Sequence, residues 1–293
     1  MWRNYLKQRQ GQVEEAMETL VPACVGEPLA EMMKAMRYSL FAGGKRLRPI
    51  LLMAAADAVG RDGRSFLHAA CALEMIHTYS LIHDDLPAMD NDDYRRGRLT
   101  NHKVFGEGMA ILAGDGLLTL AFETLLSQPD CAPGTLNRVA REVAAAAGPA
   151  GMVGGQAIDL LSEGKFPSPQ TMALMHRLKT GALFRASIRA GAILAEANET
   201  ELESLTRFAE NFGLAFQITD DILDVTGNDA VLGKPVGSDE RNQKATYVTV
   251  YSLSEAQQMA QQTVADALAS LGCFGEKAWV LRSLAEYLLT RDN

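Results

Sequence analysis

Cysteine is scarce in this chain and its spacing shows no pairs. The 293 residues include four cysteines, Cys24, Cys71, Cys131 and Cys273, and no two of them form a C-x-x-C motif. This distribution argues against a zinc site or a disulfide framework and is typical of reduced thiols in a cytosol. The charged segment MWRNYLKQRQGQVEEAMETL lacks the apolar core of a secretory signal. We therefore expect it to belong to the mature fold, and we expect a cytoplasmic protein.

Long apolar runs and surplus positive charge are missing as well. The longest uncharged run, between Glu142 and Asp159, holds four glycines and one proline and is shorter than the ~20 apolar residues of a membrane span. The net charge is −8, whereas sequence-independent nucleic-acid binding needs an excess of exposed Lys and Arg. We predict no membrane span and no nucleic-acid partner, so any anionic ligand must be held by local cations or by metal ions.

Helical periodicity runs along nearly the whole chain, and no convincing pair of alternating strands accompanies it. We therefore predict an all-α fold with ample core, since 47% of the residues are hydrophobic. No linker or composition shift divides residues 1–293, which predicts one domain. Helix starts are predicted at Ser168-Pro169 and at two capping boxes, Thr200 with Glu203 and Ser254 with Gln257. Clusters of Gly, Pro, Asn and Asp predict loops around 60–64, 90–101, 128–134, 164–168 and 227–242.

The first acidic cluster crowds five aspartates into ten residues of SLIHDDLPAMDNDDYRRG. They are Asp84, Asp85, Asp90, Asp92 and Asp93. Pro87 disrupts a helix that continues past Asp84 and Asp85. We therefore predict that Asp90 lies on a bent or terminal turn, from which it approaches the same ion as Asp84.

The second acidic cluster is QITDDILDVTG, with Asp220, Asp221 and Asp224. At about 100° per helical residue, Asp220 and Asp224 lie roughly 40° apart, and Gln217 lies on nearly the same side. On an otherwise apolar helix these carboxylates repel one another and lose hydration. They therefore require a bound cation or a solvent-filled cleft.

All-oxygen clusters of this kind favour Mg²⁺, which takes one or two carboxylates and leaves positions for water and phosphate oxygens. A calcium-binding EF-hand starting at Asp90 fails, because Arg95 stands where Gly is required and Asn101 where Glu is required. A simpler alternative for either cluster alone is a solvated acidic helix end. Two clusters accompanied by cations favour a diphosphate held between magnesium ions.

Several cations accompany the aspartates. AGGKRLRP, residues 42–49, places Lys45, Arg46 and Arg48 beside a Gly-Gly pair that permits close backbone approach, a plausible phosphate cradle. His77 projects from the same helix face as Asp84, seven residues later. Each of these residues alone is more often a surface or core residue than a ligand. Further candidates for phosphate binding are Arg95, Arg96, Lys179 of KTG and Lys234 of LGKP.

These motifs occur in the order found in the trans-isoprenyl diphosphate synthases. The segments are GGKRLRP, HDDLPAMD with DYRRG, KTG, FQITDDILD and LGKPVGSDERNQKATY. DDxxD alone is weakly specific, because terpene cyclases carry it, but the ordered set is very specific and spans nearly the whole chain. The resemblance implies a helical bundle around a deep central cavity, usually in a homodimer. It also implies head-to-tail 1'-4 condensation of isopentenyl diphosphate with an allylic diphosphate.

The resemblance also implies a role for each matching position. Asp84, Asp90 and Asp220 would ligate Mg²⁺, about three ions per site with substrate bound, with Asp85, Asp221 and Asp224 as further or water-mediated ligands. Isopentenyl diphosphate would be held by Lys45, Arg48, His77 and Arg96. The allylic diphosphate would contact Arg95, Lys179, Thr180, Gln217, Lys234 and Lys244. Arg291, in a loose match to the family's basic tail, would help close the site over the isopentenyl unit.

Product length is expected to depend on the side chains that precede the first aspartates. A bulky aromatic five positions before the motif, here Tyr79 with Ser80 beside it, and two extra residues in the Pro87-Ala88 region resemble bacterial members that make C15 farnesyl diphosphate. Tyr79 would then form the floor of the tail pocket, although it could instead only pack the bundle. Three alternatives remain: a C20 geranylgeranyl diphosphate synthase, a class I terpene cyclase, and a silent partner subunit, which the complete set of aspartates disfavours.

Overall fold

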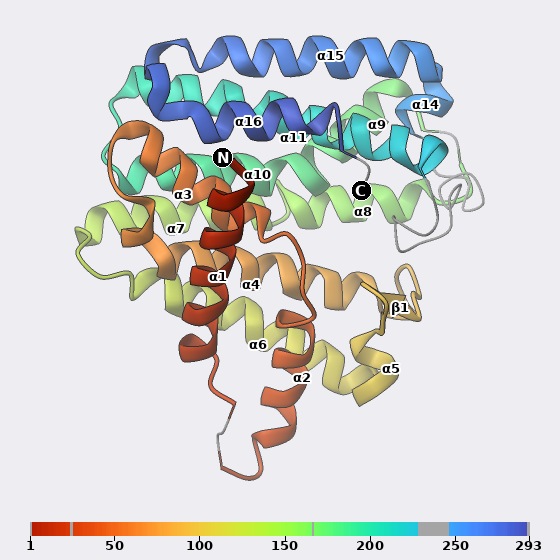
Figure 1. Cartoon of the computed structure of the whole chain (residues 1–293). Helices are drawn as coiled ribbons and strands as arrows, with labels where there is room; N and C mark the ends of the chain where they lie inside the picture. Colours follow the sequence, from red (N-terminus) through yellow and green to blue (C-terminus); the bar gives the residue numbers. More distant parts are fainter. Residues whose placement is uncertain (1, 24–25, 166, 228–245, 292–293) are drawn as a thin grey trace.

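The computed structural model describes residues 2–23, 26–165, 167–227 and 246–291, and these ranges are almost entirely helical (Figure 1). The first half contains α1 (Trp2–Leu20), α2 (Ala30–Leu40), α3 (Leu47–Val59), the 3₁₀ turn η1 (Gly63–Phe66), α4 (Leu67–Asp84), strands β1 (Tyr94–Arg95) and β2 (Arg98–Leu99), α5 (Asn101–Phe105), α6 (Glu107–Leu126) and α7 (Pro133–Ala147). The second half contains α8 (Met152–Ser162), α9 (Pro169–His176), the π-helical turn η2 (Arg177–Gly181), α10 (Ala182–Leu194), α11 (Glu199–Thr226), α14 (Tyr247–Val250), α15 (Leu253–Ser270), the 3₁₀ segment η3 (Gly272–Ala278) and α16 (Trp279–Leu288).

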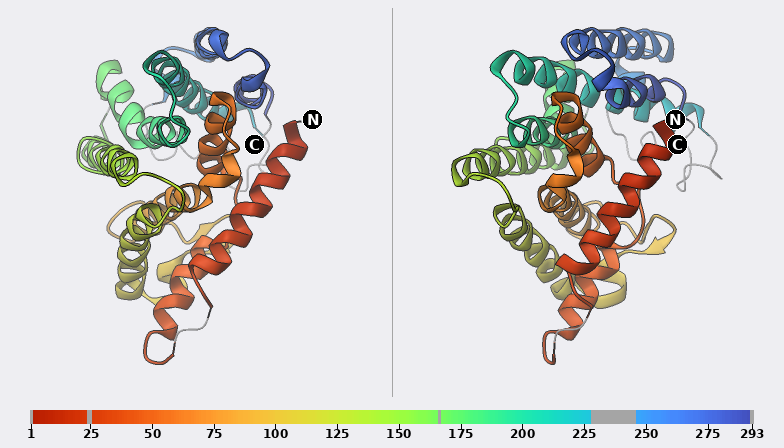
Figure 2. Two further views of the ribbon diagram at one scale, coloured as in Figure 1. Left: turned by 90° about the vertical axis from the view of Figure 1, so that its left-hand side faces the viewer. Right: turned by 60° about the vertical axis from the view of Figure 1, so that its left-hand side comes forward.

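Helix α10 lies at the centre of the arrangement. It packs against α3, α7 and α11, with α15 and α16 covering α11 on one side and the pair α4 and α6 lying on the other (Figure 1). Helix α1 crosses the edges of these layers, as both views in Figure 2 show. The buried rings of Phe184, Phe208 and Phe212 contact one another between α10 and α11, with centroids 5.5 and 5.7 Å apart. Aromatic pairs of this kind add to the apolar area that holds the two helices together.

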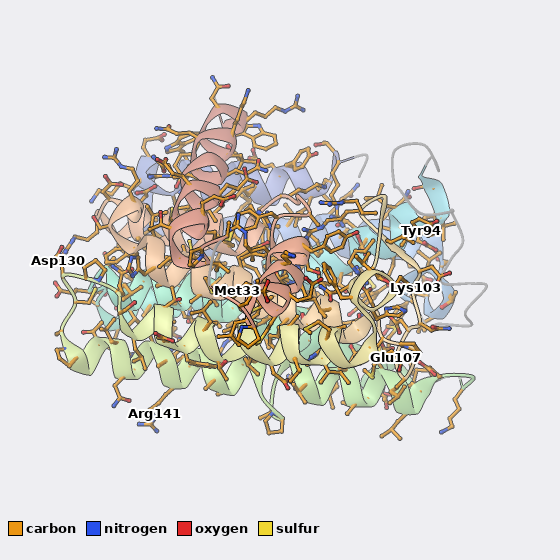
Figure 3. All side chains as sticks on the ribbon, turned by 90° about the horizontal axis from the view of Figure 1, so that it is seen from below. Met33, Tyr94, Lys103, Glu107, Asp130 and Arg141 are labelled. Atoms are coloured by element: carbon orange, nitrogen blue, oxygen red, sulfur yellow. The ribbon has the colours of Figure 1, made fainter. Side chains whose placement is uncertain are left out.

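Helix α4 carries the first aspartates and is enclosed by other helices along its length. It packs against α1, α2, α3, α6 and α10, which explains why its residues are apolar on almost every side. The hairpin and α5 follow it at the same end of the molecule. Figure 3 shows Tyr94, Lys103 and Glu107 at that end and Asp130, in the turn after α6, at the opposite end. The enclosed helix therefore delivers its aspartates to one end of the bundle.

The predicted all-α fold is confirmed, with one local exception. Residues 94–99, inside the predicted loop 90–101, form a two-residue antiparallel hairpin in which Tyr94 pairs with Leu99. The cysteines that the structure describes, Cys71, Cys131 and Cys273, are free.

The helix caps correct two sequence predictions. Ser168 caps α9 as predicted, accepting the N–H of Thr171 at 3.1 Å. The capping box of α11 is Asn198 with Glu201, and the cap of α15 is Ser252 with Glu255, each two residues earlier than predicted. In both cases the cap is an Asn or Ser followed three residues later by a Glu, and the predicted Thr or Ser lies two residues further along, inside the helix. The cap oxygen accepts an N–H, and the charged Glu is also favoured near the helix N-terminus.

Helix α6 has the length and composition of a membrane-crossing helix, and it is the single such helix in the described ranges. Of its most apolar 18-residue window, 39% is buried inside the protein. It packs against α2, α4, α5 and α7. Because core helices have the same composition, this observation is weak evidence for a membrane span.

Candidate active site

The first aspartates meet where α4 ends. Asp84 is the last residue of the helix, and the following turn brings the N–H of Asp90 to 2.9 Å from the carbonyl oxygen of Asp84. The helix stops here because Pro87 cannot continue it. The return of Asp90 to the end of the helix agrees with the bend that was predicted from the spacing of these residues.

Asp84 is contacted by two elements that lie far from it in the sequence. The Lys179 Nζ in η2 lies 3.9 Å from Asp84 Oδ2 and 2.6 Å from Asp159 Oδ2 on α8. The amide of Gln156, also on α8, donates to Asp84 Oδ1. Sequence analysis missed Gln156 and Asp159. The available signal was GGQAID, in which these two polar residues stand three apart, on one face of a helix, directly after two glycines.

A π-helical turn presents Lys179 and Thr180. Such turns are rare and frequently occur at functional sites. Helix α8 lies directly against this turn because Gly155 has no side chain, since a Cβ there would collide with the backbone nitrogen of Lys179. The Thr180 hydroxyl donates to Gln217 Oε1 at 3.1 Å, and this contact joins the turn to α11.

The adjacent aspartates of α11 have different surroundings. Asp221 is buried and accepts hydrogen bonds from the Gln217 amide at 2.8 Å and from the Tyr247 N–H at 2.7 Å. It therefore ties α11 to the start of α14. The Asp220 side chain is 54% exposed, and Asp224 follows it one turn later and is half-buried. Asp220 and Asp224 are thus the less buried carboxylates of this cluster.

Arg291 lies beside Asp220, and its predicted role in closing the site over the isopentenyl unit stays a prediction. Its Nη2 donates to the Thr219 hydroxyl at 2.9 Å and lies 3.5 Å from Asp220 Oδ1. Its guanidinium stands 4.4 Å over the ring of Phe216, an arrangement that stabilises a cation. Burial and the nearby Arg291 lower the pKa of Lys45, while Asp220 opposes them. Lys45 therefore lies in the same electrostatic field as Arg291 and Asp220.

Arg48, His77 and Arg96 form a second group of cationic or potentially cationic side chains. The guanidinium of Arg48 lies 4.7 Å over the ring of Phe184, and burial lowers its pKa to about 10. Burial, and then the charges of Arg48 and Arg96, hold the pKa of His77 well below its ordinary range. His77 is therefore neutral at pH 7 and can donate one N–H. Together with Lys45, these residues are called the GGKR cation group below.

The Gly-Gly pair lies directly against Arg96. Arg96 donates to the carbonyl oxygen of Gly43, and a Cβ at Gly44 would lie 2.6 Å from the Arg96 guanidinium. Gly44 also has φ +122°, a backbone conformation that favours glycine. The group that lies close to this pair is therefore an arginine of the hairpin, and the predicted phosphate cradle stays a prediction.

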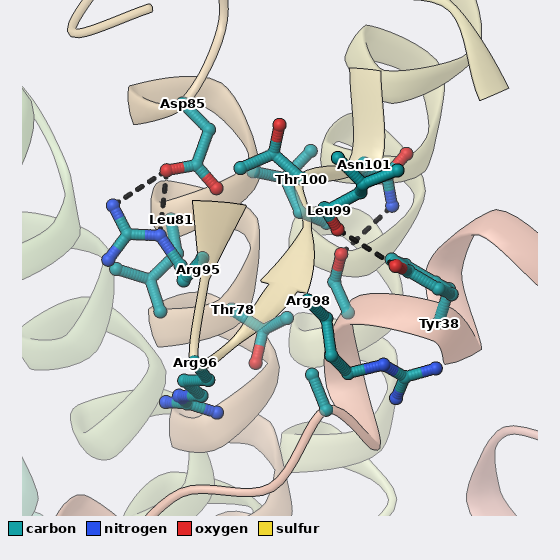
Figure 4. A pocket seen from close by; sticks show the side chains of 13 residues that line it. Tyr38, Thr78, Leu81, Asp85, Arg95, Arg96, Arg98, Leu99, Thr100 and Asn101 are labelled. Atoms are coloured by element: carbon teal, nitrogen blue, oxygen red, sulfur yellow. Dashed lines mark hydrogen bonds and ion pairs between the residues drawn. The ribbon is translucent and has the colours of Figure 1, made fainter. Parts of the chain in front are cut away.

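The hairpin also places Arg95 on Asp85. Arg95 Nε donates to Asp85 Oδ1 at 2.7 Å, and Arg95 Nη2 forms an ion pair with the same oxygen at 2.6 Å. Burial raises the pKa of Asp85 to about 6, although Arg95 works in the opposite direction. Figure 4 shows Arg95 directed toward Asp85 and Arg98 on the other side of the hairpin near Tyr38. The small pocket drawn there lies between the hairpin, α2 and α4.

The two residues predicted to limit product length lie on α4 before Asp84. Tyr79 is buried, and its ring meets the His83 ring edge to face with centroids 5.7 Å apart. The Ser80 hydroxyl donates to the carbonyl oxygen of His77 at 2.8 Å. The floor role of Tyr79 stays a prediction. Lys234 and Lys244, the other predicted phosphate ligands, lie outside the described residues.

The carboxylates suit magnesium only if a ligand supplies further oxygens. In the ranges that the structure describes, no group of three or more His, Cys, Asp or Glu side chains is arranged to hold a metal ion. Asp84, Asp90, Asp220 and Asp224 nevertheless supply only hard oxygen donors. Mg²⁺ typically takes one or two protein carboxylates and completes its shell with water and phosphate oxygens. The donor set therefore fits Mg²⁺ bound together with a diphosphate.

Comparison with known proteins agrees with this site. Residues 30–278 match the family model "Polyprenyl synthetase". The chain is 50% identical over 256 residues to a farnesyl diphosphate synthase of Geobacillus stearothermophilus (87% of this chain, 86% of the relative). It is 45% identical over 291 residues to a geranylgeranyl diphosphate synthase of Cyanophora paradoxa (99% and 96%). A crystal structure of an FPP/GFPP synthase from Zymomonas mobilis has a TM-score of 0.89 at 38% identity, covering 98% of each chain.

The described fold is helical apart from one short hairpin, and its site brings carboxylates and cationic side chains together. The chain belongs to the polyprenyl synthetase family. The resemblance that the ordered motifs indicated is confirmed.

Proposed function

We propose that this protein is a prenyltransferase that condenses isopentenyl diphosphate head to tail (1'-4) with dimethylallyl diphosphate and then with geranyl diphosphate, giving farnesyl diphosphate. One observation carries this proposal. The site contains two separate sets of side chains suited to a diphosphate, one around Lys179 beside Asp84 and one at the Gly-Gly loop. A diphosphate is needed at each of two positions in a condensation of two diphosphate esters, whereas a terpene cyclase holds only one.

The allylic diphosphate is assigned to the side lined by Lys179, Thr180 and Gln217, with Lys234 and Lys244 from outside the described residues. Lys179 already lies between Asp84 and Asp159. Its ammonium is placed to bind the leaving diphosphate when the allylic C–O bond breaks. The Thr180 hydroxyl and the Gln217 carbonyl present dipoles toward the allylic cation, and apolar walls exclude water that would quench it.

Isopentenyl diphosphate is assigned to the GGKR cation group. Arg48 and Arg96 supply fixed positive charge, and neutral His77 supplies an N–H donor without adding further repulsion among the cations. Once isopentenyl diphosphate is oriented by its diphosphate, its double bond attacks the allylic cation. The double bond is the nucleophile, and the proton released afterwards is taken up by the departed diphosphate, so neither a side-chain nucleophile nor a side-chain base is required.

Magnesium is the cofactor that this donor set would hold, through Asp84 and Asp90 on one side and Asp220 on the other. Bound there, Mg²⁺ would neutralise charge that accumulates on the leaving diphosphate. Asp85 and Asp221 are engaged by Arg95 and by the start of α14. Their contribution to the metal is therefore proposed to be indirect, through the placement of their neighbours.

A geranylgeranyl diphosphate synthase would use the same diphosphate and metal residues and differ only in the depth of its tail pocket. The aromatic Tyr79, buried one turn before Asp84, favours the shorter C15 product. We also infer one domain, a homodimer and a cytoplasmic location. Exposed apolar side chains on α5 and α6, Val104, Ile111 and Leu112, support a subunit interface on that face.

The test is a product-length assay. Purified protein with Mg²⁺ and isopentenyl diphosphate is given dimethylallyl, geranyl or farnesyl diphosphate, and the dephosphorylated products are separated by chromatography, with an EDTA control. Mainly C15 alcohol from the first two primers, abolished by EDTA, is the expected result. A C20 product would replace the farnesyl assignment, and no condensation with any primer would overturn the enzyme assignment.

A further inference from the structure

A buried ion pair lies beneath the GGKR cation group and is not explained by the ligand contacts proposed above. Arg46 Nη1 lies 3.0 Å from Glu74 Oε1, and the two side chains are 1% and 2% exposed. Arg46 Nη2 also donates to the carbonyl oxygen of Leu40 at 2.8 Å. Burying two charges carries a desolvation penalty and seldom adds net stability over apolar packing. We therefore expect the pair to have a role other than stabilising the fold.

Arg46 occupies a strained position between two members of the cation group. Its backbone has φ 50° and ψ 38°, a left-handed conformation that non-glycine residues rarely adopt, at the residue before α3. Lys45 precedes it and lies in the field of Asp220 and Arg291, whereas Arg48 lies over the ring of Phe184. The backbone turn at Arg46 thus sends these two cations to different neighbours. Strain of this kind persists only where surrounding contacts over-determine it.

Helix α1 holds the same loop from the other side. The amide of Gln10 donates to the carbonyl oxygen of Gly44 at 3.1 Å, and Glu14 Oε1 lies 3.6 Å from Arg46 Nε. Glu74 contacts Arg46 from α4, on the inner side of the loop. The Gly-Gly loop is therefore clamped between α1 and α4, with Arg46 in the middle of the clamp.

The negative charge of Glu74 also stabilises the charged forms of Arg48 and Arg96. Among the described residues, its Oε2 is buried and has no hydrogen-bond partner. The Glu74 carboxylate raises the pKa of Arg48 and of Arg96, although burial is the larger influence and lowers both. Glu74 is thus a shared negative charge behind side chains that would otherwise repel one another.

We propose that Glu74 and Arg46 are positioning residues, which hold the GGKR cation group in the arrangement that binds the diphosphate of isopentenyl diphosphate. This inference rests on the proposed function and adds a pair of residues that do not touch the substrate. A positioning role and a purely electrostatic role predict opposite changes in diphosphate affinity when Glu74 is neutralised. If Glu74 supplied charge alone, its neutralisation would increase the positive potential and tighten diphosphate binding. If it positions the cations, its neutralisation loosens binding.

The experiment compares Glu74→Gln with the unmodified full chain. Steady-state kinetics with Mg²⁺ give KM for isopentenyl diphosphate and for dimethylallyl diphosphate, and calorimetry measures binding of isopentenyl diphosphate alone. We expect KM and Kd for isopentenyl diphosphate to rise about tenfold, with KM for dimethylallyl diphosphate and kcat changed less than about threefold. A Kd that is unchanged or lowered would overturn the proposal.

The control is Glu142→Gln, which breaks another carboxylate–guanidinium pair. Glu142 on α7 accepts two hydrogen bonds of 2.6 Å from Arg189 on α10. This variant is expected to lower Tm without changing KM for either substrate. An equal rise in KM for isopentenyl diphosphate in the control would mean that the effect of Glu74→Gln reflects general destabilisation, which also overturns the proposal.

If Glu74→Gln does not fold, a variant of the α1 contact to the Gly-Gly loop tests the same proposal. Gln10→Ala removes the hydrogen bond to Gly44 and is compared with Gln8→Ala, an exposed position on the same helix. We expect about a threefold higher Kd for isopentenyl diphosphate in Gln10→Ala, and no change there rejects the clamp. Because calorimetry needs no turnover, the binding result stands even if the unmodified protein proves unable to condense the substrates.

Discussion

Lys179 donates a hydrogen bond of 2.6 Å to Asp159 while its ammonium lies 3.9 Å from Asp84. The two carboxylates come from α8 and α4, and the lysine between them comes from a π-helical turn. In the absence of ligand this cation offsets part of the repulsion between the acidic groups. The same ammonium is then available to a diphosphate that enters beside them.

Lys179→Gln removes that cation and should weaken stabilisation of the leaving diphosphate. We expect kcat/KM for dimethylallyl diphosphate to fall about 100-fold, with KM for isopentenyl diphosphate nearly unchanged. Steady-state kinetics with each substrate varied in turn measure both values. Lys165→Gln is the control, because Lys165 is exposed and donates to the Leu161 carbonyl oxygen. Equal losses for both substrates would contradict the assignment of Lys179 to the allylic side.

Asp84→Asn and Asp220→Asn test the carboxylates that are proposed to hold Mg²⁺ in the two acidic motifs. Replacing a carboxylate by an amide keeps the shape but removes the charge that a divalent cation requires. Each variant should lose about a thousandfold in kcat at saturating substrates and should need more Mg²⁺ for half-maximal rate. Asp130→Asn, in the turn at the opposite end of the molecule (Figure 3), serves as the control and should behave like the unmodified protein.

Tyr79→Ala tests the floor of the tail pocket. Removing the ring opens space one turn before Asp84, so chain growth should continue past C15 to C20 and longer products. Tyr79→Phe retains the ring and should still stop at C15. Chromatography of the dephosphorylated products from geranyl diphosphate separates these outcomes. A Tyr79→Ala protein that stops at C15 would assign this side chain to helix packing alone.

His176 predicts a pH-dependent loss of stability. Burial lowers its pKa to about 4, with Lys179 acting in the same direction and Asp159 opposing. Below an unfolded pKa of about 6.5, the unfolded chain takes up a proton that the folded chain refuses, so the free energy of unfolding decreases until the pH reaches the folded pKa. Between pH 7.5 and 5 this amounts to about 2 kcal/mol.

Urea unfolding at both pH values, for the unmodified chain and for His176→Phe, measures this contribution. The raised pKa of Asp85 acts in the opposite direction, because protonation of its buried carboxylate favours the folded state as the pH falls through about 6. Asp85 is present in both proteins, so its contribution cancels in the difference. The pH-dependent loss should be about 2 kcal/mol smaller in His176→Phe. Parallel losses in the two proteins would show that His176 is not the responsible group.

Gly155→Ala tests the contact between α8 and the π-helical turn. The added methyl group would collide with the backbone nitrogen of Lys179, and backbone cannot move aside as a flexible side chain can. We expect a loss of about 2 kcal/mol in the free energy of unfolding. Gly134→Ala, on α7, is the matched control, because no atom lies within 4 Å of its added Cβ. That variant should be neutral or slightly more stable, since alanine favours helices.

Much of the protein follows from its sequence. Apolar residues at helical spacing predict the all-α fold, and Pro87 predicts the end of α4 and the return of Asp90 toward Asp84. The ordered motifs indicate the family. These inferences succeed because they depend on local geometry, such as the 100° step of a helix, the missing N–H of proline and the charge of a side chain.

Some site residues could not be predicted from the sequence because their partners are distant along the chain. Asp159 meets Lys179 twenty residues later, and Glu74 meets Arg46 across the space between α4 and the Gly-Gly loop. Nothing in the local pattern of either residue separates it from an ordinary helix residue. The capping boxes were misplaced for a related reason, because two nearby Ser, Thr or Asn residues can each fit the motif and one backbone conformation selects between them.

The sequence by itself thus determined the helical fold, the family and the two acidic motifs, whereas the tertiary structure decided which neighbours each carboxylate meets. Consecutive residues of a helix point in directions about 100° apart, so one of two adjacent aspartates must face away from the other. Arg95 engages Asp85, and the start of α14 engages Asp221. Asp84 instead meets Gln156 and Lys179, and Asp220 meets Arg291, because only the packed neighbours of each helix determine which direction is buried.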